Sequence, residues 1–449
     1  MSRKELFAKY DVPVPRYTSY PTVPYWQNNI DTRSWLESVN QSLKPTDAAW
    51  SLYLHIPFCE SLCTFCGCNT VITKDHKKES AYADLIHREW DLYQKQVPDL
   101  LNRPLRHLHL GGGTPTFLSA ENLHYLLKPL FEKFHIEKNR FEASIEVDPR
   151  RTDKTQLKIL FDLGFRRVSM GVQDFNPEVQ RLVNRIQPFE ITRDLVDESR
   201  KIGYTSVNFD LIYGLAGQTL NSFESTINQT ITLAPDRIAL YSFALVPWIK
   251  PQHRLFKDED LPVGAEKRAL YEMARMKLID FGYLEIGMDH FALKKDGLSQ
   301  ALSEQRLHRN FMGYTDQKTD LLLGLGVSSI SESADHFHQN EKLLPTYEEN
   351  LMSQKIPTHR GHFLSDLDCS DRKNILQLMT KYEIELSPTQ LIDAREFLKE
   401  LISDRLVKIE DNLLQVTAEG KPFIRNICVL FDTHMRKKNP QQKVFSSSI

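Results

Sequence analysis

Four of the six cysteines in this 449-residue chain lie within ten residues, at positions 59, 63, 66 and 68. The Cys-x3-Cys-x2-Cys spacing places three thiolates on one short loop, an arrangement suited to binding an iron–sulfur cluster. A cubane cluster has four irons, so three protein ligands leave one iron free to bind a small molecule. The sequence therefore predicts an open-iron 4Fe–4S cluster held by Cys59, Cys63 and Cys66, with Cys68 as a neighbour.

Other uses of the clustered cysteines stay open at this point. A structural zinc site usually takes two Cys-x2-Cys pairs from separate loops, whereas Cys369 and Cys428 are each isolated. Cys68 could close the cluster as a fourth ligand, although a position two residues after Cys66 is cramped. A disulfide framework is typical of small secreted domains, and this chain is long. Zinc and a closed cluster remain the alternatives to an open one.

The composition excludes several classes of partner. Lys plus Arg (57) nearly balances Asp plus Glu (59), so no global field attracts nucleic acid or an anionic membrane. The first residues lack the apolar core of a secretory signal, and no apolar run approaches the roughly 20 residues needed to span a bilayer. Clustered thiols fit a reducing compartment. We expect a cytoplasmic protein with no nucleic-acid or membrane partner.

From about residue 50, short apolar segments alternate with longer amphipathic ones. The apolar segments, predicted to be strands, cover 51–55, 105–110, 143–147, 167–171, 206–211 and 237–241. Apolar residues recur at spacings of three and four in the segments between them, which predicts helices over 81–95, 120–134, 154–163, 191–202 and 223–233. This α/β alternation indicates parallel βα units that curl into a barrel or part of one.

The chain divides into four predicted segments. A Pro- and Tyr-rich arm (1–45) is expected to fold over an active site, and the barrel (46–250) and a barrel extension (251–355) follow. The last segment (356–449) has predicted helices near 373–381 and 388–404 and a hairpin over 406–416. Helices followed by a hairpin resemble a winged helix, which often binds DNA. Because the segment is not notably basic, a structural or substrate-covering role is favoured.

Polar residues recur at the ends of the predicted strands. In parallel βα barrels, chemistry collects at the carboxyl ends of the strands, so these residues are expected to share one pocket. They are Tyr53 and His55 on the first strand, Glu146 and Asp148 on the third, Gln173 and Asp174 after the fourth and Asp210 on the fifth.

Three consecutive glycines, Gly111-Gly-Gly113, end the second predicted strand. A phosphate-binding loop would need a following Gly-Lys-Ser/Thr, which is absent. Consecutive glycines let the backbone approach a ligand closely and offer it carbonyl and amide groups. Such a backbone suits a ligand with an ammonium group.

Taken together, these residues resemble the radical S-adenosylmethionine enzymes and, more closely, the oxygen-independent coproporphyrinogen III oxidases. The resemblance covers nearly the whole chain, and only Leu215-Ala-Gly-Gln218 departs mildly from the pattern. Its motifs are Pro15-Arg-Tyr-Thr-Ser-Tyr-Pro21, Tyr53-Leu-His-Ile-Pro-Phe-Cys59, Cys63-Thr-Phe-Cys-Gly-Cys68, Gly111-Gly-Gly-Thr-Pro-Thr116, Ser144-Ile-Glu-Val-Asp-Pro149, Met170-Gly-Val-Gln-Asp-Phe175, Val183-Asn-Arg185, Asp210-Leu-Ile-Tyr-Gly214, Gly287-Met-Asp-His-Phe291, Leu307-His-Arg-Asn-Phe311 and Ile424-Arg-Asn-Ile-Cys428.

The resemblance implies a partial (β/α)6 TIM-like barrel, a 4Fe–4S cluster and two molecules of S-adenosylmethionine. The implied reaction converts two propionates of coproporphyrinogen III to vinyl groups and gives protoporphyrinogen IX. A propionate C–H bond is scarcely acidic, so a 5′-deoxyadenosyl radical rather than a side-chain base would remove the hydrogen. A monomer served by a one-electron reductant such as flavodoxin or ferredoxin is expected.

Two other classes of protein, with functions different from the oxidase, remain as alternatives for this sequence. A related family of haem-trafficking proteins shares the barrel and the cysteine loop but lacks the N-terminal arm, so the arm with Arg16 and Tyr17 favours the oxidase. A zinc-bearing winged-helix protein that binds DNA is the other alternative.

The resemblance and the chemistry of the side chains together assign expected roles. Residues expected to bind the first S-adenosylmethionine are Tyr53, Phe65, Gly112, Gly113, Thr114, Glu146, Gln173, Arg185 and Asp210. Glu146 suits ribose hydroxyls, and Arg185 suits a methionyl carboxylate. Residues expected at the nucleoside or at the second molecule are Ala244 and Ile330. Tyr53 and His55 are the candidate catalytic residues, and candidates for the substrate carboxylates are Arg16, His55, His290 and Arg309.

Overall fold

A curved sheet is the central feature of the computed structural model, which describes residues 3–28, 30–437 and 445. Within these residues the sheet has 13 strands in the order β1-β17-β16-β15-β14-β2-β5-β6-β7-β8-β9-β11-β10. All six predicted strands are present, and each pairs in parallel with the next: β2 (Trp50–Ile56), β5 (Leu105–Gly112), β6 (Glu142–Val147), β7 (Phe165–Gln173), β8 (Ser206–Tyr213) and β9 (Arg237–Ser242).

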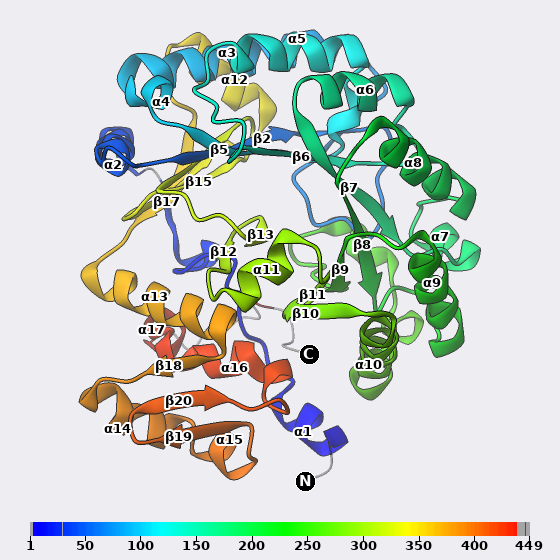
Figure 1. The fold of residues 1–449 in the computed structure, drawn as a ribbon, viewed down its shortest axis with the longest axis vertical. Coiled ribbons are helices and arrows are strands. Elements are labelled where there is room, and N and C mark those ends of the chain that lie inside the picture. Colours follow the sequence, from blue (N-terminus) through cyan, green and yellow to red (C-terminus); the bar gives the residue numbers. More distant parts are fainter. Residues whose placement is uncertain (1–2, 29, 438–444, 446–449) are drawn as a thin grey trace.

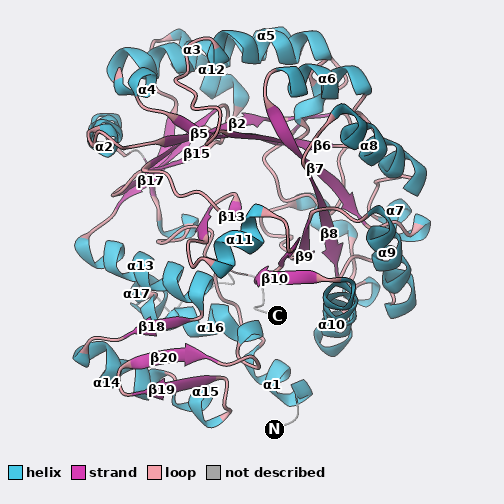
Figure 2. Ribbon diagram, viewed as in Figure 1, coloured by secondary structure: helices cyan, strands magenta, loops and turns pink. Residues whose placement is uncertain are grey.

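Helices cover the convex side of this sheet (Figures 1 and 2). They are α3 (Lys78–Gln96), α5 (Ala120–Phe131), α6 (Lys154–Asp162), α8 (Phe189–Ile202), α9 (Leu220–Leu233) and α10 (Gly264–Phe281). Side chains in the sequence define several of their starts, since Ser119, Asp153 and Thr219 each accept hydrogen bonds from the first backbone amides. The predicted helices therefore lie where their periodicity placed them.

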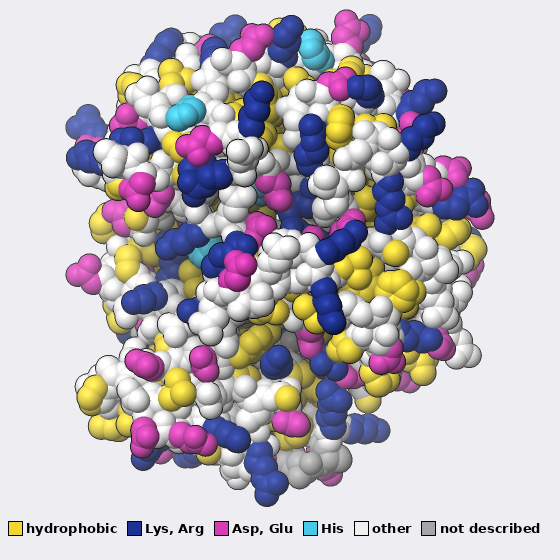
Figure 3. Space-filling model, in the orientation of Figure 1, with side chains coloured by type: hydrophobic (Ala, Val, Ile, Leu, Met, Phe, Trp, Pro, Cys, Tyr) yellow, Lys and Arg dark blue, Asp and Glu magenta, His cyan; other side chains and the backbone are white. Residues whose placement is uncertain are grey.

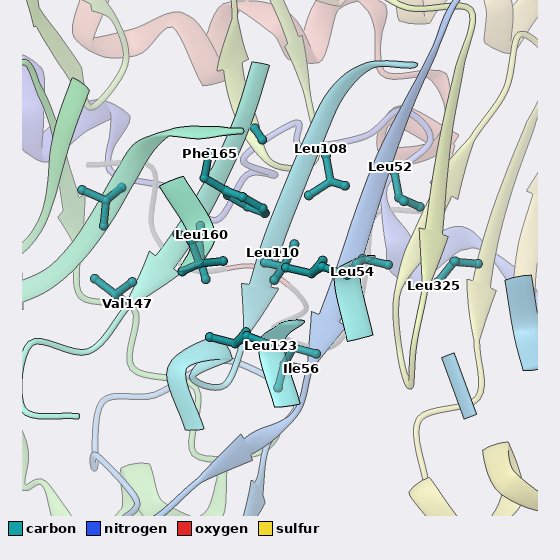
Figure 4. Packing of buried hydrophobic residues seen from close by; sticks show 14 of the residues in the cluster. Leu52, Leu54, Ile56, Leu108, Leu110, Leu123, Val147, Leu160, Phe165 and Leu325 are labelled. Carbon is teal, nitrogen blue, oxygen red and sulfur yellow. The ribbon is translucent and has the colours of Figure 1, made fainter. Parts of the chain in front are cut away.

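Successive side chains of β2 alternate between the apolar core and the concave face of the sheet. Leu52, Leu54 and Ile56 are fully buried in the main apolar cluster, beside side chains from the helices (Figure 4). Successive side chains of a strand point to opposite faces, so Tyr53 and His55 point to the concave face. Burying a leucine contributes about 1.5–3 kcal/mol, and this packing fixes which side chains of β2 can reach the site.

Further strands extend the sheet at both edges. Beyond β2 lies parallel β14 (Leu321–Leu325), then β15 (Ile330–Glu332), β16 (His336–Asn340), β17 (Thr358–Phe363) and β1 (Gln27–Asn28). Beyond β9 lie antiparallel β11 (His290–Leu293) and β10 (Tyr283–Gly287). Within the described residues the two edge strands, β1 and β10, are not paired with each other. The predicted partial barrel is thus confirmed as an open one.

The C-terminal domain lies at the open side of this sheet (Figure 1). It contains α13 (Asp366–Lys381), β18 (Glu383–Glu385), α14 (Pro388–Phe397), α15 (Lys399–Ser403), β19 (Val407–Glu410), β20 (Leu413–Val416), α16 (Ile424–Cys428) and α17 (Thr433–Lys437). The predicted hairpin is β19–β20, and the long helix predicted over 388–404 is divided at Leu398. Strand β17 belongs to the large sheet although it follows residue 355; the division into four segments stays a prediction.

The first part of the N-terminal arm, with α1 (Arg3–Tyr10), packs against the C-terminal domain, whereas α2 (Thr32–Leu43) packs into the main apolar cluster of the large sheet. Tyr10, Tyr17 and Tyr20 are buried in the apolar cluster of that domain. The Tyr17 hydroxyl donates to Asp432 Oδ2 at 3.1 Å, and Arg425 donates to the arm's backbone carbonyls. The two ends of the chain are therefore joined to one another.

The described part of the chain contains no helix both long and apolar enough to cross a membrane. On the face shown in Figure 3, Lys and Arg side chains are interspersed with Asp and Glu. This mixture agrees with the formal net charge of −2.

Candidate active site

A cavity of about 380 Å³ lies at the carboxyl ends of the parallel strands, beside the cysteine loop. Strand β2 runs into β3 (Phe58–Cys59), which pairs with β4 (Val71–Ile72), and the loop between them carries the other clustered cysteines. The predicted site residues that line the cavity are Cys59, Cys63, Phe65, Cys66, Gly112, Gly113, Thr114, Glu146, Gln173, Arg185 and Asp210. The structure thus brings eleven predicted residues to one space.

The cysteines have different environments. Burial raises the pKa of the Cys59 thiol to about 11, although the Thr114 hydroxyl lies 3.3 Å from its sulfur. A hydrogen bond from Cys68 holds the pKa of Cys66 below its usual value and raises that of Cys68. Cys68 also lines the cavity, next to Cys66, and its place as a neighbour rather than a ligand stays a prediction. A thiolate is the form that binds metal, and the hydrogen bond from Cys68 favours that form at Cys66.

The glycine run fixes the cysteine loop to the end of β5. Gly113 N–H donates to Ile56 O at 2.8 Å, and a Cβ at Gly113 would lie 2.6 Å from Pro57 O. Gly112 has φ +118°, and a Cβ there would lie 2.7 Å from the His55 ring. Any larger residue would push the loop away. The glycines therefore position the loop, in addition to lining the cavity.

Glu146 is held as an ionised acceptor. Its Oε2 accepts from Gly112 N–H at 3.1 Å, and its Oε1 lies 3.3 Å from His109 Nε2. Burial opposes ionisation, but the hydrogen bond and charge of His109 outweigh it and lower the pKa of Glu146. His109 was not predicted. The pattern that could have located it is the alternation of His107 and His109 with leucines along β5, which places both histidines on the same face of the strand. Glu146 can accept hydroxyl hydrogens without being reorganised.

Arg185 contacts residues at the ends of two strands and the sulfur of Cys63. Its Nη2 donates to Gly171 O at 2.7 Å, its Nη1 lies 3.3 Å from Asp148 Oδ2, and the same Nη1 is 3.7 Å from Cys63 Sγ. Its buried Nε–H has no partner among the described residues. Arg150, which sequence reasoning missed, pairs with Asp148 and also lies 3.9 Å from Cys63 Sγ. Two guanidinium groups thus supply positive charge beside a cysteine sulfur.

Asp210 differs from Glu146 although both line the cavity. Its carboxylate accepts from Ser169 Oγ and Asn208 Nδ2, each at 3.0 Å. Burial, followed by the charge of Glu146, raises the pKa of Asp210 to about 7. Near neutral pH Glu146 is therefore ionised, whereas Asp210 is partly protonated.

Tyr53 and His55 lie beneath the cavity and do not line it. His55 Nε2 is 3.1 Å from Asn69 O; because a carbonyl only accepts, Nε2 carries the hydrogen. His55 Nδ1 then accepts from the Tyr53 hydroxyl at 3.0 Å. Burial lowers the pKa of His55, which favours this neutral form. The pair connects β2 to the backbone of the cysteine loop.

The three further substrate candidates converge on one residue. Asp289 forms an ion pair with Arg16 and lies 2.7 Å from His290 Nδ1. Burial opposes ionisation of Asp289, but Arg16, then His290 and Arg309, outweigh it and hold its pKa well below the usual range. Arg16, His290 and Arg309 therefore surround Asp289.

Tyr241 lines the cysteine cavity and also lies next to Arg16 and His290. The Tyr241 ring centroid is 5.7 Å from Arg16 Cζ and 5.9 Å from the His290 ring. Tyr241 was not predicted because an apolar strand end gives no polar signal for a tyrosine. The cationic group and the cysteine cavity are thus neighbours.

Arg309 is a buried cation, 3 % exposed, that lies 4.7 Å from the Tyr314 ring centroid. Its Nε and Nη1 have no hydrogen-bond partner among the described residues. An unpaired buried guanidinium is costly, so Arg309 is a donor available to an anion.

Ala244 and Ile330 do not line the cavity. Ala244 follows β9 and is half-buried, and Ile330 on β15 packs against the cluster of Trp26, Phe337 and Leu364. Their predicted contact with the nucleoside or a second S-adenosylmethionine stays a prediction.

Comparison with known proteins agrees with this geometry. Residues 53–230 match the family model of the radical SAM superfamily. A protein of Escherichia coli (strain K12) named oxygen-independent coproporphyrinogen III oxidase is 40% identical over 98% of this chain and 96% of its own length. This chain belongs to the oxygen-independent coproporphyrinogen III oxidase family. A Synechocystis member with the same name is 38% identical over 99% of this chain and 97% of its own length.

A solved structure supports this membership in the oxidase family. Coproporphyrinogen III oxidase from Escherichia coli, described as a radical SAM enzyme, superposes with a TM-score of 0.88 at 40% identity. The superposition covers 93% of this chain and 97% of that one.

Radical SAM enzymes use a 4Fe–4S cluster and S-adenosylmethionine, and the residues present fit both. Three cysteines line one cavity, Arg185 and Arg150 face the sulfur of Cys63, and the buried Nε–H of Arg185 is unpartnered in the described residues. A soft thiolate set suits iron–sulfur clusters. Because thiolates also bind zinc, membership in this family rather than the ligand set disfavours the zinc alternative.

Proposed function

We propose that this chain converts two propionates of coproporphyrinogen III to vinyl groups without oxygen, giving protoporphyrinogen IX for haem synthesis. The observation that carries this function is one cavity that combines three cysteines with Glu146 and Arg185, in a chain 40% identical over its length to an enzyme of that name. When bound, the cluster and S-adenosylmethionine supply a carbon radical that can abstract hydrogen from an unactivated carbon.

The chain's own residues orient the cosubstrate. Glu146 accepts from ribose hydroxyls, since its oxygens are already held by Gly112 N–H and His109. Arg185 donates its free Nε–H to the methionyl carboxylate. Asp210, whose pKa is raised to about 7, donates or accepts a hydrogen bond according to the group that faces it. Such preorganisation places the reacting atoms without a later rearrangement.

The group around Asp289 binds substrate propionates. A tetrapyrrole with four carboxylates needs several cations, and Arg16, His290 and Arg309 lie together beside Tyr241. A hydrogen bond between charged groups contributes about 1.5–3 kcal/mol. Arg309 supplies unpaired donors, whereas Asp289 holds Arg16 and His290 in place and repels a carboxylate placed too deeply.

We propose a second S-adenosylmethionine near Ala244 and Ile330, a one-electron reductant of the flavodoxin or ferredoxin class, and a cytoplasmic monomer. The near-zero net charge and the mixed surface support a protein that binds neither nucleic acid nor membranes.

Anaerobic reconstitution tests the function. The chain is loaded with iron and sulfide, reduced, and mixed with S-adenosylmethionine and coproporphyrinogen III; 5′-deoxyadenosine, CO2 and protoporphyrinogen IX are expected. A Cys63→Ser variant should form none of them. Haem binding without any CO2 would instead support the haem-trafficking alternative.

A further inference from the structure

Two histidines and an aspartate gather where the C-terminal domain meets the large sheet. His362 lies on β17, Asp368 in the first turn of α13, and His434 on α17. One candidate ligand atom from each lies within 4.8 Å of the other two. None of the three lines the cysteine cavity, so this group is separate from the candidate active site.

The carboxylate of Asp368 lies between the two imidazoles. Its Oδ2 is 3.3 Å from His362 Nε2, and its Oδ1 is 2.6 Å from His434 Nε2. Asp368 also accepts from Ser365 N–H at 3.0 Å and Ser365 Oγ at 2.8 Å, which orients it. Each Nε2 is therefore directed at one oxygen of a carboxylate that is itself fixed, and a metal ion bound there would replace the hydrogens that the two Nε2 atoms donate to it.

The environment of these side chains suits a cation. His362 and Asp368 are buried at 7% and 5% exposure, and in the described part of the chain no Lys or Arg forms an ion pair with Asp368. His362 has no other polar contact there, since its Nδ1 lacks a partner. A buried carboxylate is stabilised by a neighbouring positive charge, and a metal ion would provide it.

Ligand chemistry narrows the choice of ion. Two imidazoles and one carboxylate form a nitrogen–oxygen set that zinc commonly takes, with three protein ligands and an open fourth position. The side chain of His434 is 26% exposed, which gives an ion a path to the site and a water molecule a place to complete the coordination. Calcium and magnesium prefer oxygen ligands alone.

We propose that His362, Asp368 and His434 bind one zinc ion that fastens the C-terminal domain to the sheet. The ion would join the last strand before the domain, the first turn of its first helix, and a helix near the chain's end (Figure 1). Its binding free energy would then add to the stability of this junction.

Metal analysis of the holoenzyme tests the site. The iron–sulfur form is dialysed anaerobically against a chelator and titrated with zinc alone. Wild-type protein should take up about one zinc per chain, with nitrogen and oxygen at about 2.0–2.1 Å and no sulfur at about 2.3 Å in zinc-edge X-ray absorption. The absorption measurement distinguishes this site from zinc bound to the cysteine loop.

Matched variants complete the test. His362→Ala and His434→Ala should lose zinc uptake and the zinc-dependent rise in unfolding temperature while keeping the wild-type iron content. His359→Ala changes another histidine of β17, paired with Glu341, and should behave as wild type. Absence of zinc uptake by the wild type, equal uptake by His362→Ala, or sulfur in the first shell would overturn the proposal, whatever the decarboxylase assay gives.

Discussion

Arg309 illustrates how a single side chain can have opposite effects on stability and function. Its guanidinium is buried, and two of its nitrogens have no partner among the described residues. Donors of a buried guanidinium that make no hydrogen bond cost free energy of folding, whereas the same donors are ready for a substrate carboxylate. Replacement should therefore move stability and activity in different directions.

Arg309→Gln should lower kcat/KM for porphyrinogen about 10- to 100-fold, because a charged hydrogen bond contributes about 1.5–3 kcal/mol and about 1.4 kcal/mol corresponds to tenfold. Its unfolding temperature should stay equal or rise. Steady-state kinetics and calorimetry measure both. Arg306→Gln, which alters an exposed arginine paired with Glu304, is the control; a parallel fall of activity and stability in Arg309→Gln would contradict the assignment.

Glu146→Gln should weaken S-adenosylmethionine binding about tenfold, since one charged acceptor of hydroxyl hydrogens is lost. Equilibrium dialysis of the cluster-loaded protein measures the dissociation constant. Glu142→Gln removes a carboxylate at the other end of β6, where it pairs with Arg167, and should leave that constant unchanged. An unchanged constant in Glu146→Gln would remove this residue from the ribose contact.

Close backbone packing against the end of β5 determines where the cysteine loop lies. The end of β5 packs so closely on the start of the loop that a Cβ at Gly113 would lie 2.6 Å from Pro57 O. Gly67, inside the same loop, has no atom within 4 Å of such a Cβ. There is therefore room for a side chain at Gly67 but not at Gly113.

Gly113→Ala should reduce the iron bound after reconstitution by more than half, because a backbone oxygen cannot move aside as a flexible side chain can. Gly67→Ala, the matched control, should bind iron as the wild type does. Iron and sulfide analysis decides between them. Equal iron in both variants would show that the close packing is not needed for cluster binding.

A buried carboxylate links α3 to the strands added at the sheet edge. Glu89 accepts from Gly326 N–H at 2.7 Å, Asn340 Nδ2 at 2.6 Å and the Tyr347 hydroxyl at 2.5 Å. Burial nonetheless raises the pKa of Glu89 to about 7. The folded state therefore holds this proton more tightly than the unfolded state.

The free energy of unfolding should consequently fall as pH rises from about 4.5 to about 7, by at most about 1.4 kcal/mol per pH unit from this group. Below the unfolded pKa the contribution is complete, and above the folded pKa it is lost. Urea unfolding at several pH values measures it. Glu89→Gln should have a flatter profile, whereas Glu121→Gln, on the exposed side of α5, should follow the wild type.

Strands and helices could be predicted wherever a pattern of apolar residues within a short stretch of sequence defines them. Periodicity located the six parallel strands and their helices, but β14 was missed because Leu321–Leu325 is a short apolar run that also fits a buried helix. Its partner β2 lies far away in the sequence. Likewise, the cysteines and strand-end carboxylates were visible in the sequence, whereas the convergence of Arg16, His290 and Arg309 on Asp289 arises only from tertiary packing.

At the scale of the whole molecule, the arm and the C-terminal domain form one unit at the open side of the barrel. Arg16 reaches from the arm to Asp289, and Tyr17 reaches to Asp432. The cysteine loop, by contrast, is held by strands of the barrel. Binding of the cluster and binding of the substrate therefore depend on different parts of the chain.

Deletion of residues 1–26 should leave iron binding and slow cleavage of S-adenosylmethionine intact while reducing porphyrinogen decarboxylation to background. The buried tyrosines of the arm are lost too, so the unfolding temperature should fall. Arg16→Gln in the full chain, which keeps those tyrosines, should also lose decarboxylation, and its unfolding temperature should fall because buried Asp289 loses its ion-pair partner. Decarboxylation at the wild-type rate by both variants would exclude the arm from substrate binding.

The hydrogen bond between Tyr17 and Asp432 spans 415 residues, so it cannot form while the polypeptide is still short. At about 5–20 residues per second, a ribosome needs roughly 20 to 80 s to travel from one partner to the other. The cysteine loop (residues 59–68) is made early in that interval, and the segment that carries Asp432 is made only at its end. The cysteine loop can therefore meet iron and sulfide before the segment around Asp432 packs against the N-terminal arm.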